Sequence, residues 1–171
     1  MNNSKTKSQL GLTLIEALIA IAIFAIFALL INSIFINVLR GATKQESLKE
    51  VKQNGDVALI TMTNRIREAT DLGTCPASAS TTINIINKDG TTTQLGLASN
   101  RITAVTGPET EFLTNSFVRV TSLAITCNDL GLNPLITIDF VVEHVNNVNQ
   151  PLRAEEHANM RFLTRVGLRI N

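Results

Sequence analysis

The chain has 171 residues, of which 44% are hydrophobic and 17% are charged, and its formal net charge is +1. This near-neutral balance excludes nucleic-acid binding through bulk positive charge. The hydrophobic share excludes a chain that is disordered throughout, and two cysteines are too few for a small fold held together by disulfides. The composition is that of a modest globular domain with a membrane-associated segment.

A short basic segment precedes a long apolar one. Lys5 and Lys7 lie within the first eleven residues, which contain no acidic residue. The 23 residues of segment 17–39 are apolar except for Asn32, Ser33 and Asn37. As a helix this segment would extend for roughly 35 Å, enough to cross a hydrocarbon core of about 30 Å. The basic flank predicts that the N-terminus stays in the cytoplasm and that the C-terminal part is directed outward.

The apolar run is too long for the core of a secretory signal peptide. A plain signal anchor would explain the run but not Glu16, because a carboxylate in a membrane-spanning segment is costly and therefore predicts a function. Residues 11–23 read Gly-Leu-Thr-Leu-Ile-Glu-Ala-Leu-Ile-Ala-Ile-Ala-Ile. With the basic leader, they resemble the class III signal of type IV prepilins and type II secretion pseudopilins.

The resemblance implies a role for each residue of the signal. A prepilin peptidase would cut between Gly11 and Leu12 and N-methylate Leu12, although family members most often have Phe at this position. Glu16 would pair with the N-terminal ammonium of a neighbouring subunit during assembly. Many major pilins have a helix-breaking Pro where this chain has Ser33. The implied partners are other pilin or pseudopilin subunits, the prepilin peptidase and an inner-membrane assembly platform, and no cofactor is implied.

The helical pattern continues beyond the apolar run. Between residues 48 and 69, apolar side chains recur at spacings of three and four, which is typical of an amphipathic helix. No proline occurs before Pro76. We therefore expect one helix from about Leu12 to Thr70, ended by Gly73 as its C-terminal cap. Its hydrophobic half would protrude, and its amphipathic half would pack on the head.

The periodicity changes to that of strands after the helix. Asp89-Gly90, between two alternating segments, is a strong hairpin signal. Strand character is found in residues 82–87, 91–97, 101–105, 116–127, 135–145 and 160–170. The sequence therefore predicts an α+β fold, in which a long N-terminal helix precedes a mostly antiparallel sheet of five or six strands.

Four regions follow from these patterns. They are a basic leader (1–11), a hydrophobic transmembrane or filament-core helix (12–40), its amphipathic continuation (41–72) and a globular β-sheet head (73–171). The order of segments looks like that of minor pilins or J- and W-type minor pseudopilins. Before assembly the chain would cross the cytoplasmic membrane once with its head outside, and it would then enter a pilus or pseudopilus.

Cys75 and Cys127 both lie in the expected head. Outside the cytoplasm, a disulfide between them is the default interpretation, and free thiols are the alternative. A bond that closes a loop of about 52 residues would contribute roughly 4 kcal/mol to stability. Because no histidines cluster near the two cysteines, the sequence predicts no metal site.

Two other functions compete with a structural role. A membrane-tethered enzyme or sensor domain is a remote alternative, because His144 and His157 are the only histidines and no hydrolase or nucleotide-binding motif is present. A DNA-uptake pilin is the nearer alternative, although the chain has no Tyr or Trp for base stacking. The arginines available to such a pilin are Arg101, Arg119, Arg153, Arg161, Arg165 and Arg169. The last three would share one face of the final strand.

Overall fold

A computed structural model describes residues 13–128, 134–145 and 156–168. The chain divides into two compact units, Met1–Gly41 and Ala42–Asn171. The described residues of the first unit, 13–41, belong to the helix α1 (Leu14–Glu68) except for Thr13, and the helix continues into the second unit. Every described side chain of the first unit is exposed.

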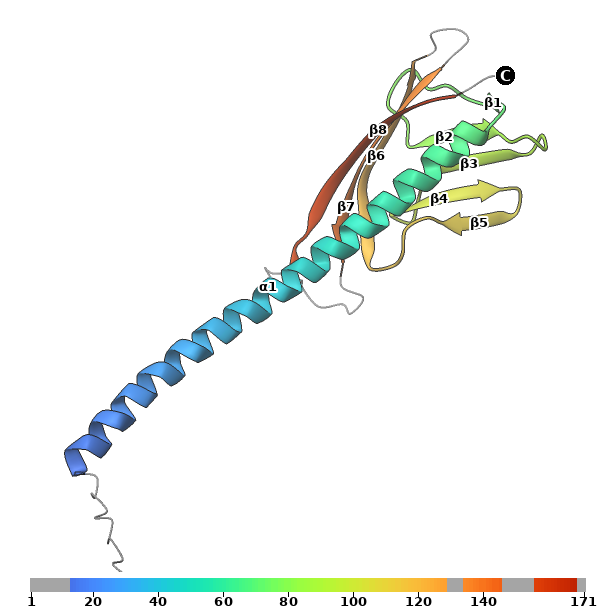
Figure 1. Cartoon of the computed structure of the whole chain (residues 1–171). Helices are drawn as coiled ribbons and strands as arrows, with labels where there is room; N and C mark the ends of the chain where they lie inside the picture. The colour runs from blue at the N-terminus through green and yellow to red at the C-terminus, as the bar shows by residue number, and fades with distance from the viewer. Residues whose placement is uncertain (1–12, 129–133, 146–155, 169–171) are drawn as a thin grey trace, which may run out of the picture. The chain divides into compact units, whose positions relative to one another are not determined.

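Within the second unit, α1 buries one face against the strands (Figure 1). The buried residues of this face recur every three or four positions, and they include Val51, Gly55, Ala58, Met62 and Ile66. This recurrence follows from 3.6 residues per turn, which brings such positions onto one stripe. The predicted amphipathic packing of this half of the helix is confirmed.

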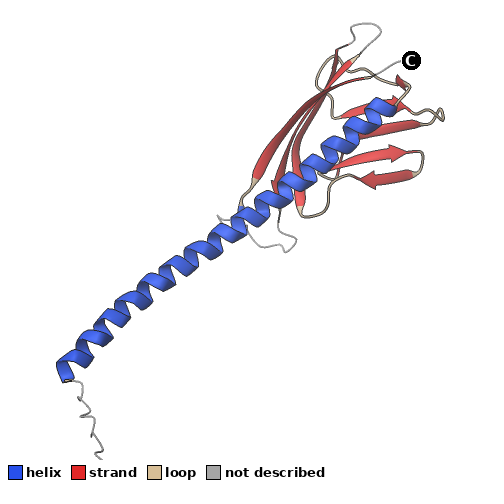
Figure 2. Cartoon of the chain, viewed as in Figure 1, coloured by secondary structure: helices blue, strands red, loops and turns tan. Residues whose placement is uncertain are grey.

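The strands form two antiparallel sheets, drawn in red in Figure 2. The first sheet has the order β1 (Asp71–Leu72), β2 (Thr82–Ile86), β3 (Thr92–Ala98), β4 (Arg101–Thr106) and β5 (Glu109–Phe112). The second has the order β6 (Val118–Asn128), β7 (Leu135–His144) and β8 (Asn159–Gly167). The α+β class and the antiparallel pairing are confirmed, but the described residues form two sheets rather than one.

The turns agree with the local sequence signals. The hairpin predicted at Asp89-Gly90 joins β2 to β3, and Gly90 has a φ of 82°. Glycine adopts this left-handed conformation without steric cost. Ser99 and Asn100, with φ of 50° and 59°, make the next turn, between β3 and β4.

The end of α1 departs from the prediction. The helix ends at Glu68, because the Thr70 amide donates to the Ile86 carbonyl at 2.8 Å and β1 then pairs with β2. Gly73 is therefore not a helix cap, and its amide donates to the Asn84 carbonyl at 2.9 Å. Pairing with β2, a strand distant in sequence, thus ends the helix before the chain reaches Gly73.

One hydrophobic core joins the second part of α1 to both sheets. Its two aromatic rings, Phe140 of β7 and Phe162 of β8, are stacked with centroids 5.2 Å apart. Phe140 is fully buried, and Phe162 is 7% exposed. The ring of Phe162 also lies against Gly55 of α1, so that the helix approaches β8 closely at a residue without a side chain.

Candidate functional site

The first described turn of α1 holds Glu16 in a capping box. Glu16 Oε2 accepts from the backbone amide of Thr13 and from its hydroxyl, both at 3.5 Å. In return, the amide of Glu16 donates to the Thr13 hydroxyl at 3.4 Å. The two residues thus satisfy donors that a helix N-terminus leaves without partners. Gly11 and Leu12, the predicted processing residues, lie outside the described residues.

The helix after Glu16 presents an apolar surface in all directions. Large apolar side chains from Leu14 to Leu39 are 42–81% exposed. Among the described residues, α1 is the helix that is long and apolar enough to cross a membrane by length and composition. An apolar surface of this extent is not stable in water and requires cover by lipid or by other apolar helices.

The predicted disulfide is present. Cys75, in the loop after β1, is joined to Cys127 of β6, and their Cα atoms are 5.2 Å apart. Next to this bond, the Cys127 amide donates to the Pro76 carbonyl at 2.7 Å. Ser80 forms a bridge with Ile125 of β6. The segment after β1 is therefore attached to the second sheet both covalently and through its backbone.

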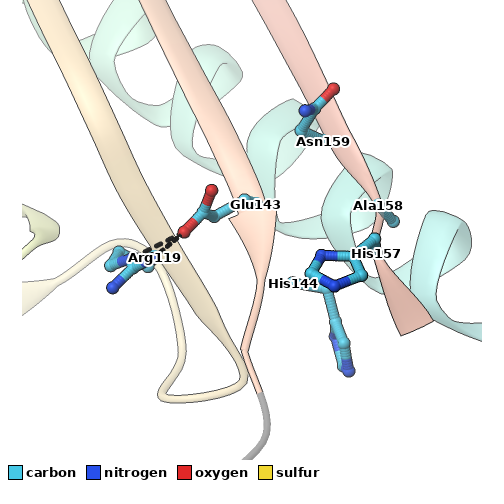
Figure 3. Close-up of a pocket in the computed structure, with 6 residues that line it drawn as sticks. All are labelled: Arg119, Glu143, His144, His157, Ala158 and Asn159. Carbon is cyan, nitrogen blue, oxygen red and sulfur yellow. Dashed lines mark hydrogen bonds and ion pairs between the residues drawn. The ribbon is translucent and has the colours of Figure 1, made fainter. Parts of the chain in front are cut away.

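A polar cavity of about 220 Å³ lies at the end of the second sheet (Figure 3). Its lining residues are Arg119, Glu143, His144, His157, Ala158 and Asn159. Figure 3 shows Arg119 turned toward Glu143, to which it donates, whereas the two imidazoles point elsewhere. No group of three His, Cys, Asp or Glu residues in the described ranges is arranged to hold a metal ion.

The head arginines that the structure describes are largely engaged with neighbouring groups. Arg119 pairs with Glu143, and Arg161 pairs with Asp139 across β7 and β8. Arg101 donates to the Thr114 carbonyl, and its guanidinium lies 4.0 Å from the Phe112 ring centroid. Arg161 and Arg165 share the exposed face of β8, as expected. Arg153 and Arg169 lie outside the described residues.

The guanidinium of Arg161 affects the charge of its partner. Its hydrogen bond to the carboxylate lowers the pKa of Asp139 below the ordinary value of 3.8. Asp139 therefore stays ionised over a wider acid range than a free carboxyl group. This ion pair links the neighbouring strands β7 and β8 of the second sheet.

One contact was not foreseen. His144 Nδ1 at the end of β7 lies 3.3 Å from Glu50 Oε2 of α1, and both atoms are buried without a hydrogen bond in the structure. The two residues are 94 positions apart in the sequence (144 minus 50). No local signal predicts such a contact. The capping box was also not predicted, although its Thr-x-x-Glu pattern before an apolar run is a local signal that indicates it.

Comparison with known families supports the interpretation of the N-terminus. A family model described as the prokaryotic N-terminal methylation motif matches residues 6–32. No curated protein and no solved structure shows a significant match to the chain. The N-terminal segment is thus similar to this methylation motif, and residues 14–32 of the match lie in the apolar part of α1.

Proposed function

We propose that the chain is a structural subunit, a minor pilin or pseudopilin, of a type IV pilus or a type II secretion filament. The observation that carries the proposal is the match of residues 6–32 to the N-terminal methylation motif. Further support comes from the exposed apolar surface of α1 between Leu14 and Leu39, which suits lipid before assembly and neighbouring helices afterwards. In this proposal the head performs no chemistry.

Processing is proposed to occur between Gly11 and Leu12, with N-methylation of Leu12. A residue without a side chain before the cut suits a peptidase pocket, and a bulky residue there would block access. We expect Gly11→Leu to accumulate as an uncleaved precursor and Gln9→Leu, a matched change in the leader, to be cleaved normally. Mass spectrometry of the N-terminal peptide measures both cleavage and methylation. Normal cleavage of Gly11→Leu would remove the proposed site.

Glu16 is proposed to pair with the N-terminal ammonium of a neighbouring subunit. The capping box offers a competing explanation, since Glu16 already has a local role with Thr13. The two roles differ in what they require. Gln preserves a capping box but carries no charge, whereas Thr13→Ala removes the cap and leaves the carboxylate in place.

Two variants therefore separate these roles. We expect Glu16→Gln to insert into the membrane but to fail to enter filaments, and Thr13→Ala to enter them at a level near that of the parent. Membrane fractionation and immunoblotting of sheared filaments provide the measurements. If Glu16→Gln assembled normally while Thr13→Ala did not, capping would be the function of Glu16 and the charge pairing would be wrong.

The neighbouring subunits would identify the filament. Cross-linking of the assembled protein, followed by mass spectrometry, is expected to recover either pilus subunits or secretion pseudopilins. Recovery of neither, with the protein still in the membrane after cleavage, would contradict a filament role. The same experiment tests the proposed contact with the inner-membrane assembly platform.

A further inference from the structure

Asn32 is an exposed polar side chain within the apolar part of α1. It lines a groove of about 420 Å³ on the helix surface, together with Phe24, Phe27, Ala28, Ile31 and Phe35. Among the described residues, no hydrogen bond joins the Asn32 side chain to a partner. An amide carries two N–H donors and an acceptor oxygen, so it requires partners wherever water is excluded.

The position of Asn32 along the helix places it away from water when the helix spans a bilayer. It lies eight residues before Arg40, or about 12 Å along the helix axis, and sixteen residues after Glu16, or about 24 Å. With Arg40 at one interface of a hydrocarbon core of about 30 Å, Asn32 is inside this core. Asn37 is only about 4.5 Å from Arg40 along the axis, close enough to reach the interface.

The helix itself does not satisfy this amide completely. Asn54, in the same helix, donates to the carbonyl of Glu50 four residues earlier, at 2.9 Å. An equivalent bond from Asn32 would use one donor and leave the acceptor oxygen and the second N–H without partners. A serine differs because its hydroxyl has a single donor, which one such bond satisfies, as Ser47 shows by donating to the Thr43 carbonyl at 3.2 Å.

We propose that Asn32 pairs with Asn32 of a second copy of this chain while both helices lie in the membrane. Two copies inserted with the same orientation place the two amides at the same depth. The amide is self-complementary, because each copy offers a donor to the acceptor of the other. This inference rests on the membrane-inserted state of the proposed function and adds a specific contact to it.

The shape of the groove suits a second helix. Ala28 lies one turn before Asn32, between the larger side chains of Phe24 and Phe35. A small residue at this point lets two backbones approach closely enough for side-chain amides to meet. A purely apolar partner helix would fill the groove but leave the Asn32 amide without a partner, which favours a second copy over such a helix.

The test uses the processed, full-length protein in vesicles of phosphatidylethanolamine and phosphatidylglycerol. Two populations labelled with a donor or an acceptor fluorophore at the C-terminus report pairing by energy transfer over a range of protein-to-lipid ratios. Hydrogen bonds between membrane helices contribute modestly, so we expect Asn32→Leu to weaken pairing by about 3- to 20-fold. Asn32→Gln, which keeps an amide, should retain pairing.

Asn37→Leu is the matched control, since it removes the same group near the interface, and we expect its affinity to stay within about twofold of the parent. Equal pairing by Asn32→Leu and the parent, or no pairing by the parent at any density, would overturn the proposal. The vesicles contain no filament machinery. A chain that pairs here but never enters filaments would contradict the proposed function alone, so the two can fail separately.

Discussion

The contact between Gly55 and Phe162 allows a sharp test of how α1 is attached to the head. A Cβ atom at Gly55 would lie 2.1, 2.2 and 2.6 Å from three ring carbons of Phe162. Carbon atoms prefer separations of about 3.5–4.0 Å. The helix and the ring would therefore have to separate by about 1.5 Å before Ala could be accommodated. Phe162 is also confined because its ring is stacked on that of Phe140.

The magnitude follows from two opposing effects of Gly55→Ala. In an exposed helix the change would stabilise by about 1 kcal/mol through helix propensity. Overpacking of a confined core site costs about 1–3 kcal/mol, and the shift needed here belongs at the upper end of that range. We expect a net loss of about 2 kcal/mol, which for a head of this size lowers Tm by about 7 °C.

Urea unfolding of the processed protein in mild detergent, read by pulse proteolysis of the head, measures this loss. Gly41→Ala is the control in the same helix, because a Cβ there meets nothing within 4 Å. Phe162→Leu should relieve the clash, so that the double variant loses less stability than the sum of the single variants. A stabilising Gly55→Ala, or additive effects in the double variant, would refute the close approach of α1 to β8.

Three further predictions concern the strands. Replacing both Cys75 and Cys127 with Ala should lower the free energy of unfolding by about 4 kcal/mol, because the disulfide no longer closes a loop across 52 residues and the unfolded chain gains entropy. The same urea assay measures this loss, and an unchanged unfolding midpoint would contradict the prediction. Asp139→Asn should cost about 0.5 kcal/mol at pH 7. Since folding lowers the pKa of Asp139, the contribution of its charge to stability is present above the ordinary value of 3.8 and is lost as the pH falls through the lowered pKa. The stabilities of the parent and the variant should therefore converge in unfolding experiments at acid pH. Gly90→Ala should destabilise the head by about 1 kcal/mol through the backbone conformation alone, because φ is 82° and a Cβ there meets nothing within 4 Å. Thermal unfolding measures this loss, and Gly90→Asn should show a smaller one.

Much of the fold was predictable because its signals are local. The three- and four-residue spacing after residue 48 reports burial of one helix face, and Asp89-Gly90 reports a turn that needs a positive φ. The division into two sheets was not predictable, because alternation shows which side chains face inward and not which strands pair. No alternation of buried and exposed residues indicated β5, since all four residues of Glu109–Phe112 are exposed.

In the candidate site, too, the features with local sequence signals were predictable and those that depend on long-range packing were not. Thr13 and Glu16 are three residues apart, so their mutual hydrogen bonds could be anticipated from the pattern alone. The two cysteines could be paired because the chain has no others. His144 and Glu50 meet only because α1 packs against the end of β7, which depends on the whole head being folded.

The geometry of the capping box bears on how Glu16 would change partners. Its hydrogen bonds, at 3.4–3.5 Å, are longer than the 2.7–3.2 Å of typical N–H···O bonds, so the cap contributes toward the lower end of the usual 0.5–2 kcal/mol. An unpaired carboxylate among apolar helices would cost about 3–5 kcal/mol. Exchange of the weak cap for a neighbouring ammonium is therefore favourable only in the register that brings the two charges together. Under the proposed assembly, Glu16 would thus select the register of the subunit more than it would add to the stability of the filament.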